Sequence, residues 1–334
     1  MTNARPQPLS LSPGLAAGPT PASRWRQGLR RFLVVAGPGL IVMVADNDAG
    51  AISTYTQAGA QYGTRLLWVL LLLLPITYFV QEMVARLGIA TGHGYAAVIH
   101  RRFGPWWGRL SLANLLLLNF LTLVTEFAAV ALAAARAGLA PGAVVPLAAL
   151  FLVLLVATGS YRRWERLTLA LCGLNLVWLV LAVQAGPDWA MAGHDLVHPV
   201  APAGGWTRDA VFLVLAIVGT TIAPWQLFFQ QSCVADKRLR FADLRAARLD
   251  TLVGAVAVVG FAAAMVLVGD ALHRAGQPYA DPAQMAEALT PVLGRLGFHA
   301  VLLLMVNAAL VGAATISLSS AWAWGEVMGG SSRR

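Results

Sequence analysis

The sequence predicts an all-α, polytopic membrane protein, and three observations lead to this fold class. First, 58% of the 334 residues are hydrophobic and only 12% are charged, whereas about 25% of the residues of a soluble domain are charged. Second, apolar segments long enough to cross a bilayer recur along the chain. Third, the basic residues lie between these segments in an asymmetric pattern. The net charge of +9 therefore reflects membrane orientation, and no nucleic-acid partner is expected.

Eight apolar segments are predicted to cross the membrane as helices. Tryptophans gather near the ends of several of them, as in an aromatic belt. Residues 1–31 are rich in Pro, Ser and Ala, and we expect a disordered cytoplasmic tail there. Residues 32–327 form the predicted transmembrane domain, and residues 328–334 form a short C-terminal tail. The predicted spans cover residues 33–57, 65–88, 110–136, 142–158, 167–185, 209–233, 250–272 and 298–324.

The Lys and Arg residues predict the orientation of these spans. If the N-terminus is cytoplasmic, 19 of the 24 Lys and Arg residues fall on the inner side and the other five on the outer side. Such an excess agrees with the positive-inside rule. We therefore expect a multi-pass protein of the cell (inner or plasma) membrane, embedded in the lipid bilayer, with its N-terminus in the cytoplasm.

Two further groups of residues, the cysteines and those of one outer loop, are interpreted without a disulfide or a metal site. The cysteines, Cys172 and Cys233, belong to different spans and have no second soft ligand beside them, so neither a disulfide nor a metal cofactor is expected. The long outer loop 186–208 carries two aspartates and two histidines, among them His194 and His198. Its composition favours a solvated loop over a patch that attracts metal ions.

The first span contains two carboxylates and a glycine in its middle. Asp46 and Asp48 follow an apolar run, residues 32–44, and an ionisable group at that depth indicates a functional site. On a continuous helix the two side chains would point to roughly opposite sides, so both can face one cavity only if the chain unwinds. Gly50 and Ala51 permit unwinding at low steric cost. The alternative is a pair of carboxylates near a wet helix end, but the preceding run is long for that position.

The sixth span contains a second candidate break. Pro224 cannot donate a backbone hydrogen bond and clashes with the preceding turn, and the run Gly219 to Thr221 adds flexibility and hydroxyl groups. A proline in a membrane helix is often only a kink. Paired with a break in the first span, however, it matches the pattern of inverted repeats that bind a substrate at the membrane midplane.

Glu126 is a lone carboxylate in the third span. Two roles are considered for it. It relays a proton, or it holds a metal ligand in position without contacting the ion itself. The simpler alternative is an acid buried in its neutral form and held by a hydrogen bond. A catalytic pair of Asp46 and Asp48 would leave the second broken helix unexplained, so an enzyme is not expected.

At several points the sequence resembles the NRAMP family of divalent-metal transporters. The resemblance implies a LeuT-like fold of two inverted five-helix repeats. That family has at least ten core spans, so eight spans imply an incomplete second repeat, a C-terminally truncated chain and a protein partner that closes the bundle. The matching elements are Gly37-Pro38-Gly39, Asp48-Ala49-Gly50-Ala51, Gly59-Ala60-Gln61-Tyr62-Gly63, Gln81 and Arg86-Leu87-Gly88-Ile89-Ala90-Thr91-Gly92.

The departures from the family motifs are also informative. The family's Asp-Pro-Gly-Asn motif retains its aspartate at Asp48, but Ala51 replaces the asparagine. The family's Met-Pro-His motif becomes Ala223-Pro224-Trp225, so the thioether and the histidine are both absent. Glu126 corresponds to the family's aspartate linked to proton movement.

The resemblance also implies a set of metal ligands. The Asp48 carboxylate and the backbone carbonyls of Ala45 and Thr220 would contact the ion directly or through water, and Asp46 would add negative potential. A site without the thioether suits harder ions such as Mg²⁺ and Mn²⁺. This pattern resembles the NRAMP-related magnesium transporters. The residues expected to line the site are Gly50, Ala51, Ala223, Pro224 and Trp225.

The most direct functional prediction is therefore uptake of Mg²⁺, and also of Mn²⁺, with the ion as substrate and no resident cofactor. Loss of the histidine favours facilitated, voltage-driven movement. Two alternatives stay open. One is a proton-coupled Mn²⁺/Fe²⁺ transporter of the main family type, and the other is an inactive truncated fragment.

Overall fold

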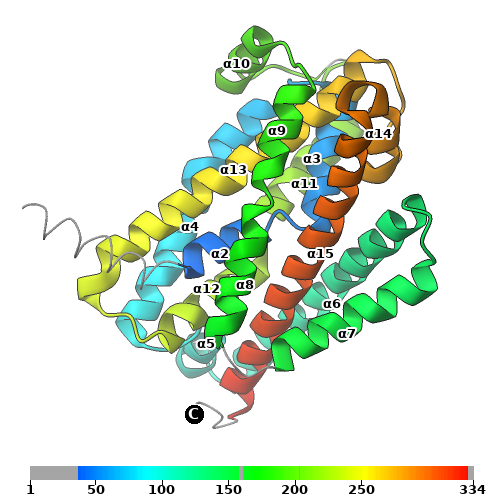
Figure 1. Ribbon diagram of the computed structural model, residues 1–334. Coiled ribbons are helices and arrows are strands. Elements are labelled where there is room, and N and C mark those ends of the chain that lie inside the picture. The colour runs from blue at the N-terminus through cyan, green and yellow to red at the C-terminus, as the bar shows by residue number, and fades with distance from the viewer. Residues whose placement is uncertain (1–36, 158–160, 203, 330–334) are drawn as a thin grey trace, which may run out of the picture.

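The computed structural model describes residues 37–157, 161–202 and 204–329, and every regular element in these ranges is helical (Figure 1). The predicted all-α class is therefore confirmed. The predicted tail 1–31 and the last residues of the predicted C-terminal tail lie outside the described ranges. The elements are α2 (Pro38–Ala45), α3 (Ala49–Tyr62), α4 (Leu67–Thr91), α5 (Tyr95–Phe103), α6 (Pro105–Arg136), α7 (Pro141–Ala157), α8 (Tyr161–Gly173), α9 (Leu176–Gln184), α10 (Trp189–Val197), α11 (Arg208–Thr221), α12 (Pro224–Asp236), η1 (Phe241–Asp243), α13 (Leu244–Arg274), α14 (Pro282–Ala288) and α15 (Thr290–Met328).

Six helical segments among the described residues are long and apolar enough to cross a membrane. They are α4, α6, the end of α8 with α9, α11 with α12, η1 with α13, and α15. The other two predicted spans are the pair α2–α3, whose halves have 8 and 14 residues, and α7, which has 17. Each of these pieces is shorter than the roughly 20 residues that a spanning helix needs.

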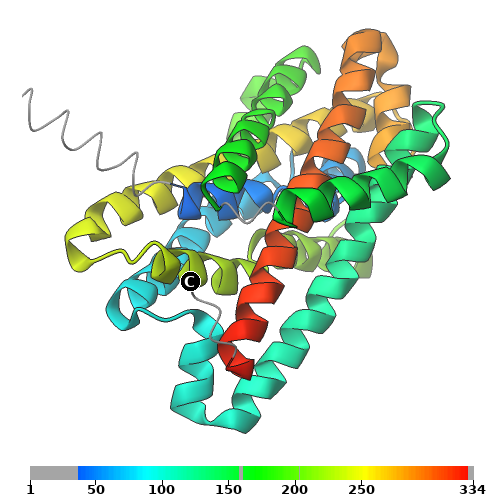
Figure 2. The same ribbon diagram turned by 60° about the horizontal axis from the view of Figure 1, so that its bottom comes forward.

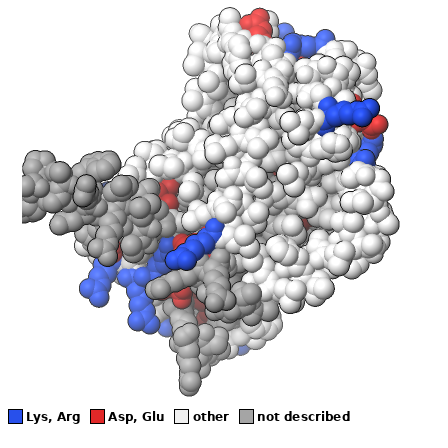
Figure 3. Space-filling view, viewed as in Figure 1, with Lys and Arg blue, Asp and Glu red and all other residues white. Residues whose placement is uncertain are grey.

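The outer surface of the bundle is mostly apolar. Phe79, Phe120 and Leu147 each expose more than 60% of their area. In Figure 3, charged side chains lie toward the ends of the visible face, and a broad uncharged region separates them. Apolar side chains exposed between charged ends are expected where helices contact lipid. The backbone needs no water there, because its polar groups are satisfied within each helix.

The broken helix α2–α3 lies against α13, and both views of the ribbon show this (Figures 1 and 2). Glycines allow the close approach. A Cβ atom at Gly254 of α13 would lie 2.8 Å from the carbonyl oxygen of Gly39, and one at Gly269 would lie 3.0 Å from the backbone nitrogen of Ala60. Small residues at a membrane helix crossing let the backbones come close enough for van der Waals contact.

The start of α2 is also fixed by α13. The buried carboxylate of Asp250 accepts hydrogen bonds from the backbone N–H groups of Gly37 (3.1 Å) and Gly39 (2.7 Å). These N–H groups have no partner within their own helix. The carboxylate therefore caps α2 and holds its first turn against α13.

Both predicted breaks exist, but they lie a few residues away from the glycines expected to cause them. The first break covers Asp46 to Asp48, and Gly50 belongs to the first turn of α3. The second break lies at Ile222 and Ala223, so the run Gly219 to Thr221 is still helical. The prediction was wrong about which residues unwind, because aspartate and proline end and restart these helices, while the glycines stay within them.

The predicted span 167–185 is also interrupted. It consists of the end of α8 and all of α9, which are separated by Leu174 and Asn175. The side-chain amide of Asn175 donates to the carbonyl oxygen of Cys172 (3.4 Å). A side chain that bonds to the nearby backbone in this way competes with the helical pattern, and the helical hydrogen bonding is interrupted at these two residues.

Candidate functional site

The first break is built by Asp48, which acts as the N-cap of α3. Its backbone is extended (φ −74°, ψ −174°), and its Oδ1 accepts the N–H of Ala51 at 2.9 Å. Aspartate is among the best N-cap residues because its side chain satisfies an N–H group that the helix cannot. The break also frees a carbonyl group. In a continuous helix the carbonyl of Ala45 would accept the N–H of Ala49, but that N–H donates to Glu126 Oε2 at 3.2 Å instead.

The second break frees a carbonyl group in the same way. The helical partner of the Thr220 carbonyl would be the N–H of residue 224, and Pro224 has none. Pro224 occupies the first turn of α12, and Ala223 before it has extended backbone (φ −82°, ψ 143°). A proline is favoured at this position because its missing N–H would be unpaired in any case.

A chain of side chains connects the two breaks. Gln226 of α12 donates from Nε2 to Oδ1 of Asp46, and its own Oε1 accepts from Nε2 of Gln81 in α4 at 2.7 Å. Tyr55 of α3 and Thr221 of α11 form a second connection through their hydroxyl groups, 2.8 Å apart. All five of these side chains are buried. The two breaks are therefore joined by buried hydrogen bonds, and the predicted metal ligands stay a prediction.

Asp48 and Glu126 form the other side of the site. Both carboxyl groups bond to the first turn of α3, Asp48 to the N–H of Ala51 and Glu126 to the N–H of Ala49. Gly312 of α15 lies against both, since a Cβ atom there would be 3.0 Å from Cβ of Asp48 and 3.3 Å from Cδ of Glu126. Glu126 therefore contacts the N-terminus of α3, which Asp48 caps. Its location agrees with the predicted role beside the ligands, although location alone does not distinguish proton transfer from positioning.

The donor atoms at the two breaks are oxygen atoms. Asp46 is 1% exposed, and its Oδ2 atom has no hydrogen-bond partner. A buried carboxylate oxygen without a donor is costly, and a cation beside it would remove that cost. In the described part of the chain, no three His, Cys, Asp or Glu side chains converge on one point as metal ligands. Oε1 of Glu126 is a second buried carboxyl oxygen near the first break that has no hydrogen-bond partner. The donors that fit a cation are therefore the aspartates, this carboxyl oxygen and the two freed carbonyls.

The predicted lining residues have different surroundings. Ala51 and Trp225 are buried, whereas Gly50 and Ala223 are partly exposed and Pro224 is exposed. The Trp225 ring packs edge-on against Phe229, with centroids 6.3 Å apart. Its backbone carbonyl accepts the hydroxyl of Ser319 at 3.0 Å. Through these contacts, Trp225 packs against Phe229 of its own helix and against α15.

Sequence reasoning gave no role to three residues that the structure brings to the breaks. They are Gln81, Gln226 and Tyr55, and each is fully buried in an apolar segment. A carboxamide in a membrane helix is a signal that could have identified the two glutamines, since such groups seek a partner on another helix. Tyr55 carries no comparable signal, because a tyrosine in an apolar segment is often only a part of the hydrophobic core.

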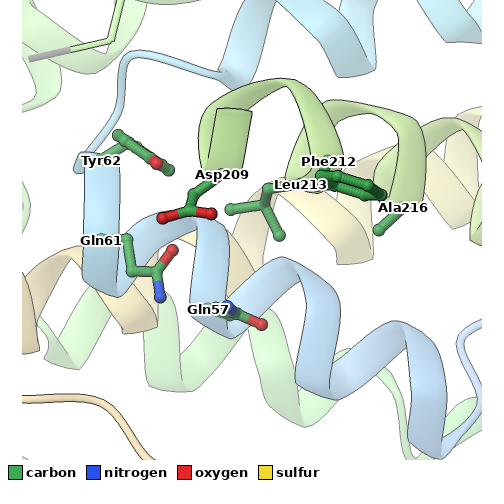
Figure 4. Close-up of a pocket in the computed structure, with 7 residues that line it drawn as sticks. All are labelled: Gln57, Gln61, Tyr62, Asp209, Phe212, Leu213 and Ala216. Carbon is green, nitrogen blue, oxygen red and sulfur yellow. The ribbon is translucent and has the colours of Figure 1, made fainter. Parts of the chain in front are cut away.

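A cavity of about 630 Å³ opens between α3 and α11, on the side of the breaks opposite to α2 and α12. Figure 4 shows Asp209 of α11 and Gln61 of α3 facing the space between the two helices. Ala216, which also lines the cavity, lies one helical turn before Thr220. This wall of the cavity therefore lies one helical turn away from Thr220. By contrast, most residues of α2 and α12 are buried.

Comparison with solved structures supports the fold. A manganese transporter from Eremococcus coleocola, in complex with an aromatic bis-isothiourea compound, superimposes with a TM-score of 0.77 and 22% sequence identity. The match covers 93% of this chain and 68% of that chain. The predicted LeuT-like transporter fold is therefore confirmed.

Comparison with characterised sequences identifies relatives. A divalent metal cation transporter MntH from Burkholderia ambifaria is 30% identical over 282 residues, which are 80% of this chain and 63% of the relative. A protein of the same description from Verminephrobacter eiseniae is 28% identical over 306 residues, which are 87% of this chain and 68% of the relative. The chain thus spans about two thirds of the length of these relatives.

The family profile described as natural resistance-associated macrophage protein-like, or Nramp, matches residues 39–334. This match includes both broken helices and every residue of the candidate site. The chain therefore belongs to the Nramp family.

Proposed function

We propose that this chain carries a divalent metal ion across a membrane through the two breaks, with Mg²⁺ and Mn²⁺ as its substrates. One observation carries the proposal: Asp46 and Asp48 are buried at the first break, and one backbone carbonyl at each break, that of Ala45 or Thr220, has lost its helical partner. Broken helices with carboxylates and free carbonyls at mid-membrane depth are a common way to bind an ion during transport. The relatives described as divalent metal cation or manganese transporters support the same class of substrate.

The two carboxylates have different surroundings, which suggests different roles. Asp48 is held as a helix cap beside Glu126 on α6, while Asp46 is directed toward α12 through Gln226. We propose Asp48 and the carbonyls of Ala45 and Thr220 as ligands, and Asp46 as an additional negative charge. The unpartnered Oδ2 atom of Asp46 also allows it to bind the ion directly.

The preference for hard ions follows from the donor atoms. Carboxylate, carbonyl and water oxygens suit Mg²⁺ and Mn²⁺, whereas thioether sulfur selects softer metals. Ala223 and Ala51 supply no side-chain donor, so the ion would retain several water molecules. Mg²⁺ gives up its water reluctantly and is usually bound in this partly hydrated form. A membrane potential of about 100 mV supplies about 4.6 kcal/mol for two inward charges, which is enough to drive uptake without a proton.

The central experiment measures ion flux into proteoliposomes that contain a Mg²⁺- or Mn²⁺-sensitive dye. Asp48→Asn removes the charge but leaves a good N-cap, because Asn and Asp cap helices about equally well. Asp188→Asn is the matched control, since Asp188 caps α10 through the N–H groups of Ala190 and Met191, both at 3.0 Å. We expect Asp48→Asn to abolish flux and Asp188→Asn to retain it. Equal flux through wild type and Asp48→Asn would refute the proposed site.

A second pair of variants tests the preference for hard ions. Ala223→Met introduces a thioether at the second break, and Ala223→Leu adds a side chain of similar size without sulfur. We expect inhibition of Mn²⁺ flux by Cd²⁺ to become stronger in Ala223→Met only. If both variants respond to Cd²⁺ in the same way, the side chain at residue 223 does not control the choice of metal.

The same liposomes separate the alternatives. A proton-coupled Mn²⁺/Fe²⁺ transporter would acidify the lumen during uptake, and an inactive fragment would show no flux above protein-free liposomes. Flux that appears only when a second protein is added would indicate a partner that completes the bundle. We further propose a cell-membrane location with a cytoplasmic N-terminus, on the basis of the Lys and Arg distribution. Protease accessibility of an N-terminal tag in sealed vesicles tests this orientation.

A further inference from the structure

At one end of the bundle α5 turns back into α6 (Figures 1 and 2), and aromatic and basic side chains surround this turn. The α5–α6 hairpin tip consists of residues 101–110. Its three aromatic side chains expose 56–71% of their area, and its three arginines are also exposed. The six residues are Phe103, Trp106, Trp107, Arg101, Arg102 and Arg109. Exposed apolar groups rimmed by charges often mark an interaction site.

The close packing of the turn keeps these side chains on its outer side. Gly104 has φ 95°, in the region that favours glycine, and it ends α5 directly before Pro105 begins α6. A Cβ atom at Gly108 would lie 2.9 Å from the Cα atom of His100. The two helices therefore touch on the inner side of the hairpin, which leaves no room there for an indole ring or a guanidinium group.

The hairpin tip keeps its positive charge. The sequence contains no Asp or Glu between Glu82 and Glu126. In the described ranges, no ion pair joins any of the three arginines to a carboxylate. Arg101 donates from Nη1 to Nε2 of His93 at 2.6 Å, and this bond does not remove its charge. The tip therefore presents three positive charges that no carboxylate of the described chain pairs with.

The length of α6 places the tip near the lipid headgroups. α6 has 32 residues, and at about 1.5 Å per residue it is about 48 Å long. The hydrocarbon core of a bilayer is only about 30 Å thick, so α6 extends beyond it. No charged residue follows Arg109 until Glu126, so the first turn of α6 lies outside the core. Trp106 and Trp107 are in this turn, at the boundary where tryptophan is enriched.

We propose that the hairpin tip binds anionic phospholipids of the surrounding bilayer. The arginines bind headgroup phosphates, because a planar guanidinium matches phosphate oxygens with two hydrogen bonds. The aromatic rings lie between the headgroups and the acyl chains, as in other helices that bind a membrane surface through a basic polar face. Anionic lipids are favoured over zwitterionic ones because the tip has a net positive charge. This surface is distinct from the two breaks, and lipid binding does not depend on the proposed transport function.

The test uses the full chain purified in detergent, with binding of phosphatidylglycerol and phosphatidylcholine measured by native mass spectrometry. We expect the wild type to bind phosphatidylglycerol at least tenfold more tightly than phosphatidylcholine. Each arginine near an anionic lipid surface contributes about fivefold in affinity, so Arg102→Gln/Arg109→Gln should weaken phosphatidylglycerol binding about 25-fold and phosphatidylcholine binding little. These two arginines are chosen because Arg101 also contacts His93. Trp106→Ala/Trp107→Ala should weaken binding of both lipids to a similar degree, because the rings carry no charge.

The matched control is Arg208→Gln/Arg295→Gln, which removes the same two charges from exposed positions. These arginines lie near the starts of α11 and α15, and the preceding helices α10 and α14 are at the end of the bundle opposite to α5 (Figure 1). The control should keep wild-type affinity for phosphatidylglycerol. Asp48→Asn should also keep it, whatever the outcome of the flux experiment. Melting temperatures of all variants show whether a loss of binding reflects unfolding.

Three results would overturn the proposal. The first is equal affinity of the wild type for the two lipids, and the second is wild-type phosphatidylglycerol affinity in Arg102→Gln/Arg109→Gln or an equal loss in the control. The third is competition by glycerol 3-phosphate at the concentrations at which phosphatidylglycerol binds. That molecule has the phosphate without the acyl chains, so its binding would show a site for a free phosphate and not for a lipid.

Discussion

The crossing of α3 and α13 offers a direct test of the structure. It requires a glycine at position 269 of α13, but not at position 260 of the same helix. A Cβ atom at Gly269 would lie 3.0 Å from the backbone nitrogen of Ala60 and 3.0 Å from the carbonyl carbon of Thr56, and closer still to the oxygen of Thr56. Ordinary contact begins at 3.4 Å. All these atoms belong to the backbone of α3, so a change of rotamer cannot relieve the clash. The helices must therefore move apart.

The cost of this movement can be isolated with a matched control. Gly260 lies on the same helix, and a Cβ atom there meets nothing within 4 Å. Both Gly→Ala changes gain about 0.5–1 kcal/mol from helix propensity, but only Gly269→Ala also carries an overpacking cost of about 1–3 kcal/mol. The propensity gain cancels between the two variants. Their difference in the free energy of unfolding should therefore be about 1–3 kcal/mol.

The assay is thermal unfolding in detergent, followed by the fluorescence of the 11 tryptophans. We expect Gly269→Ala to melt several degrees below Gly260→Ala. Ion flux through Gly269→Ala should also fall, because α3 carries Asp48 at its N-terminus and would be displaced. If Gly269→Ala melts at or above the temperature of Gly260→Ala, the close crossing of α3 and α13 is incorrect.

Three further predictions concern single side chains, two of them at the breaks and one at the start of α2. Glu126→Gln keeps an oxygen acceptor for the N–H of Ala49 but replaces the carboxyl group with a neutral amide that cannot ionise. Isothermal titration should then show weaker Mn²⁺ binding at unchanged thermal stability, and a fall in stability without a change in affinity would contradict this. Asp250→Leu leaves two buried N–H groups of α2 unpaired and should lower stability by roughly 1–3 kcal/mol per group, while Asp250→Asn should melt between Asp250→Leu and the wild type. Gln226→Leu removes the donor to Asp46 and should reduce Mn²⁺ flux, and wild-type flux would show that this bond is dispensable.

Local sequence chemistry accounts for much of the fold and for part of the site. Helices that cross a membrane satisfy their own backbone groups, so long apolar segments predict them with little tertiary information. Charged residues are costly inside such segments, and this cost is why Asp46, Asp48 and Glu126 could be recognised from the sequence. Pro224 marked the second break for a similar reason, since proline cannot continue a helix without losing a hydrogen bond.

The detailed arrangement required the tertiary structure. The unwound residues could not be chosen from the glycines alone. Gly50 lies in α3, after Asp48 has restarted the chain as a helix, and Gly219 lies in α11, before the second break. The pairing of Gln226 with Asp46 joins residues 180 positions apart, and no local pattern specifies such a contact.

The sequence by itself thus determined that the chain is a helical membrane protein with acidic groups at a broken first helix and a second break at a proline. These properties follow from the free energy of placing each residue in lipid, which depends on the residue and its near neighbours. Only the tertiary structure decided which oxygen atoms face each other. Contacts between the breaks depend on how α3, α6, α12 and α13 pack, and packing depends on the shape of all the helices together.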